Sequence, residues 1–241
     1  MDKVALIIGA GENLGSSIAR CFAKEKFKVV VARRNGETLN SLKSEIEEEG
    51  GICHSFSLDA RKENDVIKFI EEIENEIGPI EVAVYNIGAN IKYNITETTS
   101  QKYYKVWEMA AFGAFLMGRE VSKKMIQRKK GTIIFTGATA SMRGGDGFSA
   151  FSGAKHAKRA LAQSMARELG PKGIHVAHII IDGAIDTPWV KENFPEFVRQ
   201  KKDIDGLMNP DDIALNYLWI YKQPKNAWTH ELDLRPWVEK W

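Results

Sequence analysis

Apolar and polar positions follow two different periods along this chain. Short runs of mostly β-branched apolar residues alternate with longer segments whose apolar residues return every three or four positions. The short runs are typical of strands buried on both faces, and the longer segments of amphipathic helices. The predicted strands are Val4–Ile8, Lys28–Ala32, Ile52–Leu58, Ile80–Asn86, Thr132–Thr136, Ile174–Ile181 and Thr229–Leu234. The predicted helices lie near Leu14–Lys24, Gly36–Glu49, Glu63–Ile77, Gln101–Gln127, Phe151–Leu169 and Asp211–Tyr221.

Regular alternation of strand and helix predicts an α/β fold. Strands linked through helices pair in parallel and need helices on both faces, so we expect a Rossmann-type, doubly wound parallel sheet of about seven strands. No linker rich in proline, serine or glycine divides the chain, and no internal repeat is visible. We therefore expect a single domain over residues 1–241.

Two segments interrupt the alternation. Pro188–Met208 follows the sixth predicted strand and mixes Trp189, Phe194 and Phe197 with many charges. Loops at the carboxyl ends of parallel strands cover ligands, so this segment is either a lid or a pair of surface helices. Residues 228–241 hold the last predicted strand and a tail with three of the six tryptophans. Either a subunit interface or packing within the chain would bury these rings.

A glycine-rich turn joins the first predicted strand to the first helix. Its sequence is Gly9-Ala10-Gly11-Glu12-Asn13-Leu14-Gly15. Glycines let the backbone approach a pyrophosphate, and the helix N-terminus attracts its charge. The spacing is G-x-x-x-G-x-G with Asn13 at the middle glycine, and asparagine tolerates a positive φ better than most residues. A tight turn without a ligand is the simpler alternative, but strand, turn and helix together favour a dinucleotide site.

Arginines follow the second predicted strand, where an acid would bind a ribose 2′-hydroxyl. Arg33 and Arg34 suit a 2′-phosphate, which favours NADP(H) and leaves NAD(H) as the second choice. The carboxylate of Glu12 disfavours NADP(H), because it would repel the 2′-phosphate.

Further motifs in the expected order resemble the short-chain dehydrogenase/reductase family over almost the whole chain. They are Asp59 after the third strand, Tyr85-Asn86-Ile87-Gly88 at the end of the fourth, Lys155 on a long helix, and the stretch Asp182–Pro188, with aspartate in place of the family's proline. The resemblance implies an oxidoreductase that acts on a small molecule. The cofactor site it implies consists of Gly9, Gly11, Asn13, Leu14, Gly15, Arg33, Asp59, Asn86, Gly88, Lys155 and Thr187.

The same resemblance implies an unusual set of catalytic positions. In the family a tyrosine passes the proton, a lysine lowers the pKa of that phenol and binds the ribose, a serine steadies the substrate and an asparagine holds a water. Position by position, Lys155 alone is kept. Phe151 takes the tyrosine position, Ala138 the serine position and Ala110 the asparagine position, with Thr139 one residue after Ala138. A phenyl ring carries no ionisable proton.

Other polar residues could supply a proton in place of the phenol, although a surface or loop position is the simpler reading of each. His156 points about 100° round the helix from Lys155, which places it outside the cleft. The remaining candidates are Tyr93, Asp146, Ser149, Asp182 and Asp186.

Two functions from different classes therefore stay open. The first is a divergent oxidoreductase that moves hydride between a nicotinamide and a small carbonyl or alcohol, with the proton coming from water or an unconventional residue. The second is a catalytically silent NAD(P)-binding module, acting as a sensor or a partner subunit. Family membership would also imply a homodimer or homotetramer.

Composition limits the classes of partner and the cellular compartment that we expect for this protein. The net charge of +2 gives no general attraction to nucleic acid or membranes, and the basic cluster near Arg128 ends a predicted helix, where cations complement its dipole. No apolar run approaches the roughly 20 residues that span a bilayer. Two cysteines suit a reducing compartment, and a first strand starting at Lys3 leaves no room for a signal peptide. We expect a cytoplasmic protein without a metal site.

Overall fold

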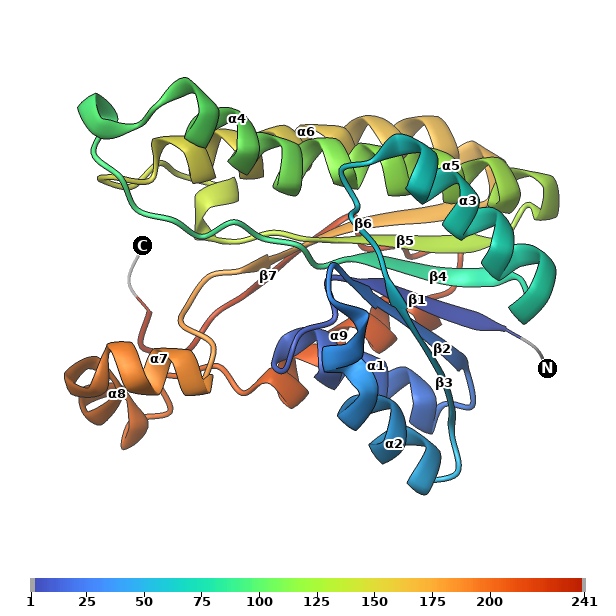
Figure 1. The fold of residues 1–241 in the computed structure, drawn as a ribbon, viewed down its shortest axis with the longest axis horizontal. Coiled ribbons are helices and arrows are strands. Elements are labelled where there is room, and N and C mark those ends of the chain that lie inside the picture. The colour runs from blue at the N-terminus through green and yellow to red at the C-terminus, as the bar shows by residue number, and fades with distance from the viewer. Residues whose placement is uncertain (1–2, 240–241) are drawn as a thin grey trace.

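A single seven-stranded parallel sheet forms the centre of the computed structural model, which describes residues 3–239 (Figure 1). Its order is β3-β2-β1-β4-β5-β6-β7, and every neighbouring pair is parallel. The chain steps outward from β1 to β3 and then returns to the other side of β1 with β4. This switch point opens a crevice at the carboxyl ends of the strands. The strands are β1 (Val4–Ile8), β2 (Lys28–Arg33), β3 (Ile52–Ser57), β4 (Ile80–Tyr85), β5 (Gly131–Thr136), β6 (Ile174–Ile181) and β7 (Glu231–Leu234).

Helices cover both faces of the sheet, which confirms the predicted doubly wound architecture (Figure 1). Strand β1 shows why both faces need cover: Ala5 and Ile7 pack into one hydrophobic core, and Val4, Leu6 and Ile8 into the other. On the first side lie α1 (Leu14–Lys24), α2 (Asn40–Glu48) and α9 (Pro210–Lys222). On the second side lie α3 (Glu63–Glu72), α4 (Ser100–Trp107), α5 (Gly113–Arg128) and α6 (Ser149–Leu169).

The helix predicted over 101–127 is interrupted in the structure. A π-helical stretch, Glu108–Phe112, separates α4 from α5. Beside it the Tyr85 hydroxyl, buried at the end of β4, donates a hydrogen bond to the Met109 carbonyl at 2.7 Å. A side chain that bonds a helix carbonyl competes with the regular ladder of the helix. A Cβ at Gly113 would lie 2.1 Å from the Tyr85 oxygen, so the helix approaches this hydroxyl at a glycine.

Residues 188–208 form two short helices beyond the carboxyl ends of the strands (Figure 1). Both α7 (Pro188–Asn193) and α8 (Pro195–Lys202) begin with proline, whose fixed φ suits a first helical position. The Thr187 hydroxyl caps α7 by accepting a hydrogen bond from the Val190 amide at 3.2 Å. The segment is thus a helix pair, and its position against the site is described below.

The tail packs on the chain itself in the part that the structure describes. Trp228 stacks on His175 with ring centroids 4.8 Å apart. The Trp237 indole donates to the Ile204 carbonyl at 2.9 Å and otherwise stays largely exposed. Trp241, which was grouped with them, lies outside the described residues.

Candidate active site

The glycine turn lies where the ends of β1 and β4 approach each other. Gly9 has a φ of +92°, and a Cβ there would lie 2.8 Å from the Ile87 backbone nitrogen. The Asn86 side-chain amide stabilises this close approach of the two segments by donating a hydrogen bond to the Gly9 carbonyl at 3.1 Å. Gly15 is equally confined, because a Cβ would lie 2.6 Å from the Ala10 Cα. A Cβ on Gly11 would meet no atom within 4 Å, so open space lies above this part of the turn.

Asn13 does not take the positive φ that its place in the motif suggested. Its φ is −115°, because it is the residue that precedes α1 and stands at the helix entrance. Within the turn the left-handed conformation falls on Gly9 instead. The positive φ expected at Asn13 is therefore wrong, although Asn13 does line the larger cavity described next.

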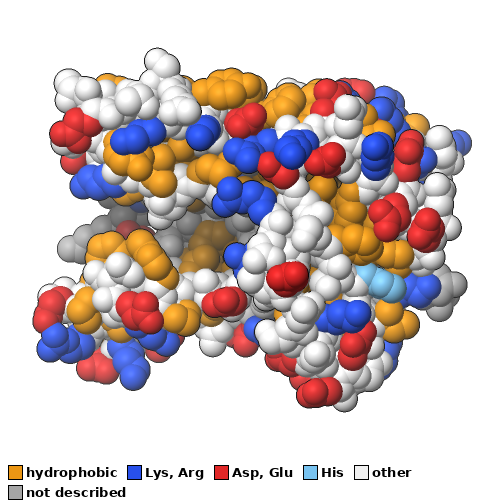
Figure 2. Space-filling view, viewed as in Figure 1, with side chains coloured by type: hydrophobic (Ala, Val, Ile, Leu, Met, Phe, Trp, Pro, Cys, Tyr) orange, Lys and Arg blue, Asp and Glu red, His pale blue; other side chains and the backbone are white. Residues whose placement is uncertain are grey.

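Two adjoining cavities follow the carboxyl edge of the sheet. The larger, about 860 Å³, reaches from the glycine turn to Lys155 and the α7–α8 segment, and the smaller, about 540 Å³, lies over the end of β2. Gly9, Gly11, Asn86 and Gly88 line both, so the two form one elongated groove. Figure 2 shows the molecule hollowed between its α4 side and its α7–α8 side.

Every residue predicted for the cofactor site lines this groove. The larger cavity is lined by Gly9, Gly11, Asn13, Leu14, Gly15, Asn86, Gly88, Lys155 and Thr187. Arg33 and Asp59 line the smaller one. Of the predicted catalytic positions, Lys155, Phe151, Ala138 and Thr139 also face the larger cavity. Ala110 does not: it is fully buried in the π-helical stretch, within an apolar cluster that includes Phe151.

The smaller cavity presents cations. Arg33 is the last residue of β2, and both it and Arg34 line the cavity. Within residues 3–239, neither guanidinium pairs with a carboxylate. Asp59 is held by Arg61 through two bonds of 2.8 and 2.7 Å, and this pairing lowers the pKa of the Asp59 carboxyl. Glu12 is exposed and lines neither cavity.

Lys155 is almost completely buried at the floor of the larger cavity. Its ammonium donates to the Thr136 carbonyl at 3.0 Å and to the Gly137 carbonyl at 3.4 Å, both at the end of β5. One helical turn earlier, the Phe151 ring centroid lies 5.5 Å from the Lys155 nitrogen. Burial lowers the pKa of Lys155 to about 8. The amine is therefore able to give up a proton near neutral pH.

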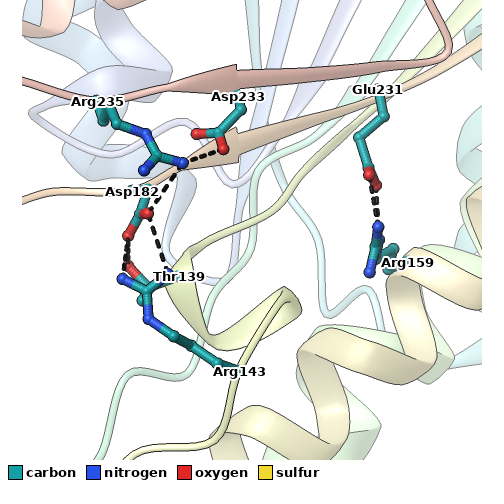
Figure 3. Close-up of polar contacts among 7 residues, drawn as sticks. All are labelled: Thr139, Arg143, Arg159, Asp182, Glu231, Asp233 and Arg235. Carbon is teal, nitrogen blue, oxygen red and sulfur yellow. Dashed lines mark hydrogen bonds and ion pairs between the residues drawn. The ribbon is translucent and has the colours of Figure 1, made fainter. Parts of the chain in front are cut away.

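Asp182 forms a buried anchor at the ends of three neighbouring strands (Figure 3). Thr139, after β5, donates its hydroxyl proton to the Asp182 carboxylate at 2.5 Å. Arg143 lies 3.3 Å and Arg235, after β7, 3.4 Å from the same carboxylate. Asp233 pairs with Arg235 in turn. In this structure the Asp182 carboxylate therefore binds the Thr139 hydroxyl and the two arginines.

The other candidate proton donors do not line the groove. Asp146 is nearly fully exposed and faces Lys92 at 3.7 Å, and Asp186 pairs with Lys191 at 2.8 Å. His156 is exposed, as expected. Neither Tyr93 nor Ser149 lines either of these two cavities, although the Ser149 hydroxyl is buried.

Ser152 and Lys158 were missed by the sequence analysis as site residues. Ser152 lines the larger cavity, and its buried hydroxyl has no hydrogen-bond partner among the described residues. Lys158 lies directly behind Lys155. Each is three residues from Lys155, so the i,i+3 spacing of a helix was the signal that could have placed all three on one face.

Aromatic side chains of the α7–α8 segment line one side of the larger cavity. Trp189, Phe194 and Phe197 line it, yet each remains at least 38% exposed. Phe148 and Phe151 line the same cavity. The apolar rings of this helix pair therefore face the site, and its role as a lid stays a prediction.

Taken together, a doubly wound parallel sheet with a glycine turn and a groove across its switch point defines a dinucleotide-binding type of α/β protein. A family model for short chain dehydrogenases matches residues 3–197, and the chain belongs to that family of oxidoreductases. A crystal structure of a short-chain dehydrogenase from Rhodopseudomonas palustris is 45% identical, with a TM-score of 0.85 and coverage of 98% of this chain and 100% of that one.

More distant relatives agree with this assignment. The 3-oxoacyl-[acyl-carrier-protein] reductase of Bos taurus is 25% identical over 93% of each chain. Zerumbone synthase of Zingiber zerumbet is 27% identical over 90% of this chain and 87% of its own. Actinorhodin polyketide ketoreductase, solved with NADPH, shares 24% identity with a TM-score of 0.89 over 97% and 96% of the two chains, which shows the fold alone. No described helix is long and apolar enough to cross a membrane.

Proposed function

We propose that this protein binds NADP(H) and transfers hydride between the nicotinamide and a small carbonyl or alcohol, without a tyrosine as proton donor. The observation that carries the proposal is the single groove that holds all the predicted cofactor residues, from Arg33 at one end to Lys155 at the other. The nicotinamide would supply the hydride, and this chain's residues would bind, orient and manage the proton.

The walls of the groove fit a dinucleotide. Open space above Gly11 lets a phosphate approach the backbone, and the first turn of α1 carries no acidic residue to repel it. Lys155 has no carboxylate partner among the described residues, so ribose hydroxyls are suitable acceptors for its protons.

NADP(H) rather than NAD(H) follows from the smaller cavity. Arg33 and Arg34 face it without a neutralising carboxylate partner in the described chain, and Glu12 is exposed and lines neither cavity. A 2′-phosphate would balance these charges, and charge-assisted bonds of this kind are strong. Relatives of the same fold were solved with NADP, among them a metagenomic short-chain oxidoreductase that is 21% identical, with a TM-score of 0.83 over 99% and 98% of the two chains.

The cofactor proposal is tested by titrating the purified protein with NADPH and NADH and following nicotinamide fluorescence. Arg33→Ala should weaken NADPH binding about 10- to 100-fold, the value of one lost charged hydrogen bond, and leave NADH nearly unchanged. Arg167→Ala, at an exposed arginine of α6 outside both cavities, is the matched control and should change neither. Equal weakening of both cofactors by Arg33→Ala would refute the 2′-phosphate assignment.

A silent cofactor-binding module is the second proposal, favoured by the Phe151 ring that faces the cavity beside Lys155. A panel of apolar ketones and secondary alcohols separates the two. Turnover by the natural protein supports the oxidoreductase. Binding without turnover, with activity appearing only in Phe151→Tyr, supports the silent module.

We also propose a homodimer or homotetramer. Rings stack along one exposed side of α4 and α5, with Trp107 and Phe112 5.9 Å apart and Phe112 and Phe115 6.1 Å apart. A contiguous apolar strip of this kind is typical of an interface. Light scattering of the purified protein measures the state directly, and a monomer at all concentrations contradicts the proposal.

A further inference from the structure

Helix α6 buries a second lysine behind Lys155. Lys158 has no exposed surface and lines neither cavity. Its amine donates to the Ile87 carbonyl at 3.1 Å and lies 5.4 Å from the centroid of the Tyr85 ring. A fully buried lysine is costly in its charged form, so this residue needs an explanation that the proposed function does not supply.

Among residues 3–239, the groups that face the two lysines offer no negative charge. Tyr85 reaches Lys158 from β4, and burial raises the pKa of its phenol, which therefore stays neutral. His178 faces them from β6, and burial lowers the pKa of its imidazole to about 4, so it is neutral as well. The carboxylate that contacts His178 belongs to Glu231, and Arg159 binds that carboxylate at 2.6 Å (Figure 3).

Neither Lys155 nor Lys158 has a carboxylate partner in the part of the chain that the structure describes. The two lysines lie one helical turn apart on α6, and each of them shifts the pKa of the other. Two ammonium groups side by side in a buried site repel each other. Among the described residues no carboxylate offsets the free-energy cost of removing them from water. Such a pair titrates as a unit.

We propose that Lys155 and Lys158 share a single proton, with Lys158 as the neutral amine that accepts a hydrogen bond from the Lys155 ammonium, and that Lys155 is the group that exchanges a proton with the substrate. The last part rests on the proposed function. In carbonyl reduction, the substrate gains a hydride on carbon from the reduced nicotinamide and a proton on oxygen. An N–H bond of Lys155 breaks as the O–H bond forms. Lys155 is left as a neutral amine and regains its proton from water in the open cavity.

The directions of the two pKa values agree with this division. Burial lowers the pKa of Lys155 to about 8, and the neighbouring Lys158 amine acts in the opposite direction by raising it. The pKa of Lys158 is lowered much further, first by burial and then by the charge of Lys155. The proton therefore resides on Lys155, the member of the pair that faces the cavity.

Lysine-selective NMR of the cofactor-free protein tests the pair directly. With ¹³C-labelled lysine, Lys155 should titrate near pH 8, and Lys158 should show the chemical shift of a neutral amine at pH 7. In Lys158→Met the pKa of Lys155 should fall below about 8, by about one unit, because the charged form loses a hydrogen-bond acceptor. Lys158→Gln keeps an acceptor at that place and should restore most of the shift.

The outcomes separate this inference from the proposed function. A charged Lys158 at pH 7, or a Lys155 pKa that Lys158→Met leaves unchanged, overturns the shared proton whatever the enzyme does. Should Lys158→Met fail to fold, the titration of the natural protein and of Lys158→Gln decides the question. If the NMR result holds but neither NADPH nor NADH binds, the pair stands and the proposed function fails. In an active enzyme, the pH at which kcat/KM falls on the alkaline side should move with the Lys155 pKa, while NADPH affinity stays the same.

Discussion

Gly9 and Gly11, in the same turn, provide a matched test of which glycine the close packing of the backbone requires. Gly9→Ala places a Cβ 2.8 Å from the Ile87 nitrogen at a φ of +92°, whereas Gly11→Ala places one in open space. A left-handed backbone costs an L-residue about 1–2 kcal/mol, and forcing a methyl group against backbone costs about 1–3 kcal/mol. Gly9→Ala should therefore lower the free energy of unfolding by about 3 kcal/mol, and Gly11→Ala by less than about 0.5 kcal/mol.

Urea unfolding followed by circular dichroism measures both variants. For a chain of this size, the loss in Gly9→Ala corresponds to a fall in Tm of about 6–12 °C. NADPH titration adds an independent reading, because Gly11 lines both cavities and its new methyl group would occupy the space above the turn. Gly11→Ala should then bind NADPH more weakly although its stability is unchanged. Equal stabilities for the two variants would refute the assignment of the tight crossing to Gly9.

Two further predictions concern the buried Asp182 carboxylate, which follows β6, and the buried His178 imidazole within β6. Asp182→Ala removes the carboxylate that Arg143 and Arg235 both contact and should cost about 3 kcal/mol in urea unfolding, while Asp233→Ala, at a more exposed partner, should cost less than half of this. Burial lowers the pKa of His178 from its ordinary 6.5 to about 4, so the unfolded chain binds more protons between these values. Stability should be complete above pH 6.5 and fall by up to about 3 kcal/mol as the pH drops to 4. His178→Gln should flatten that part of the profile, and an unchanged slope would contradict the neutral buried imidazole.

Much of this architecture follows from local pattern. Apolar runs of strand length and amphipathic segments of helix length fixed the order of the elements, since each period is a property of neighbouring residues. Observed bounds differ from the predicted ones by a few residues, as at β7, which begins at Glu231 rather than Thr229. The glycine turn was equally visible, because its function depends on spacing within one strand, one turn and one helix.

Long-range contacts decided what the pattern could not. The sequence predicted one continuous helix over 101–127. In the structure a π-helical stretch interrupts it, where the Tyr85 hydroxyl at the end of β4 donates a hydrogen bond to the Met109 carbonyl. Asn13 sits in a glycine-like motif position, yet the packing of Gly9 against Ile87 placed the left-handed residue elsewhere.

The protonation and pairing of the titratable side chains also depend on the tertiary structure. In the sequence Asp182 was one of several candidate proton donors, and its partners Arg143 and Arg235 lie 39 and 53 residues away along the chain. Nothing in the sequence singled out Lys158, which the structure buries completely against the Ile87 carbonyl and the Tyr85 ring. The sequence by itself determined the sheet, the glycine turn and the predicted cofactor residues along the groove. Which of those residues carry charge depends on burial and on partners brought from distant segments, and only the folded chain sets these.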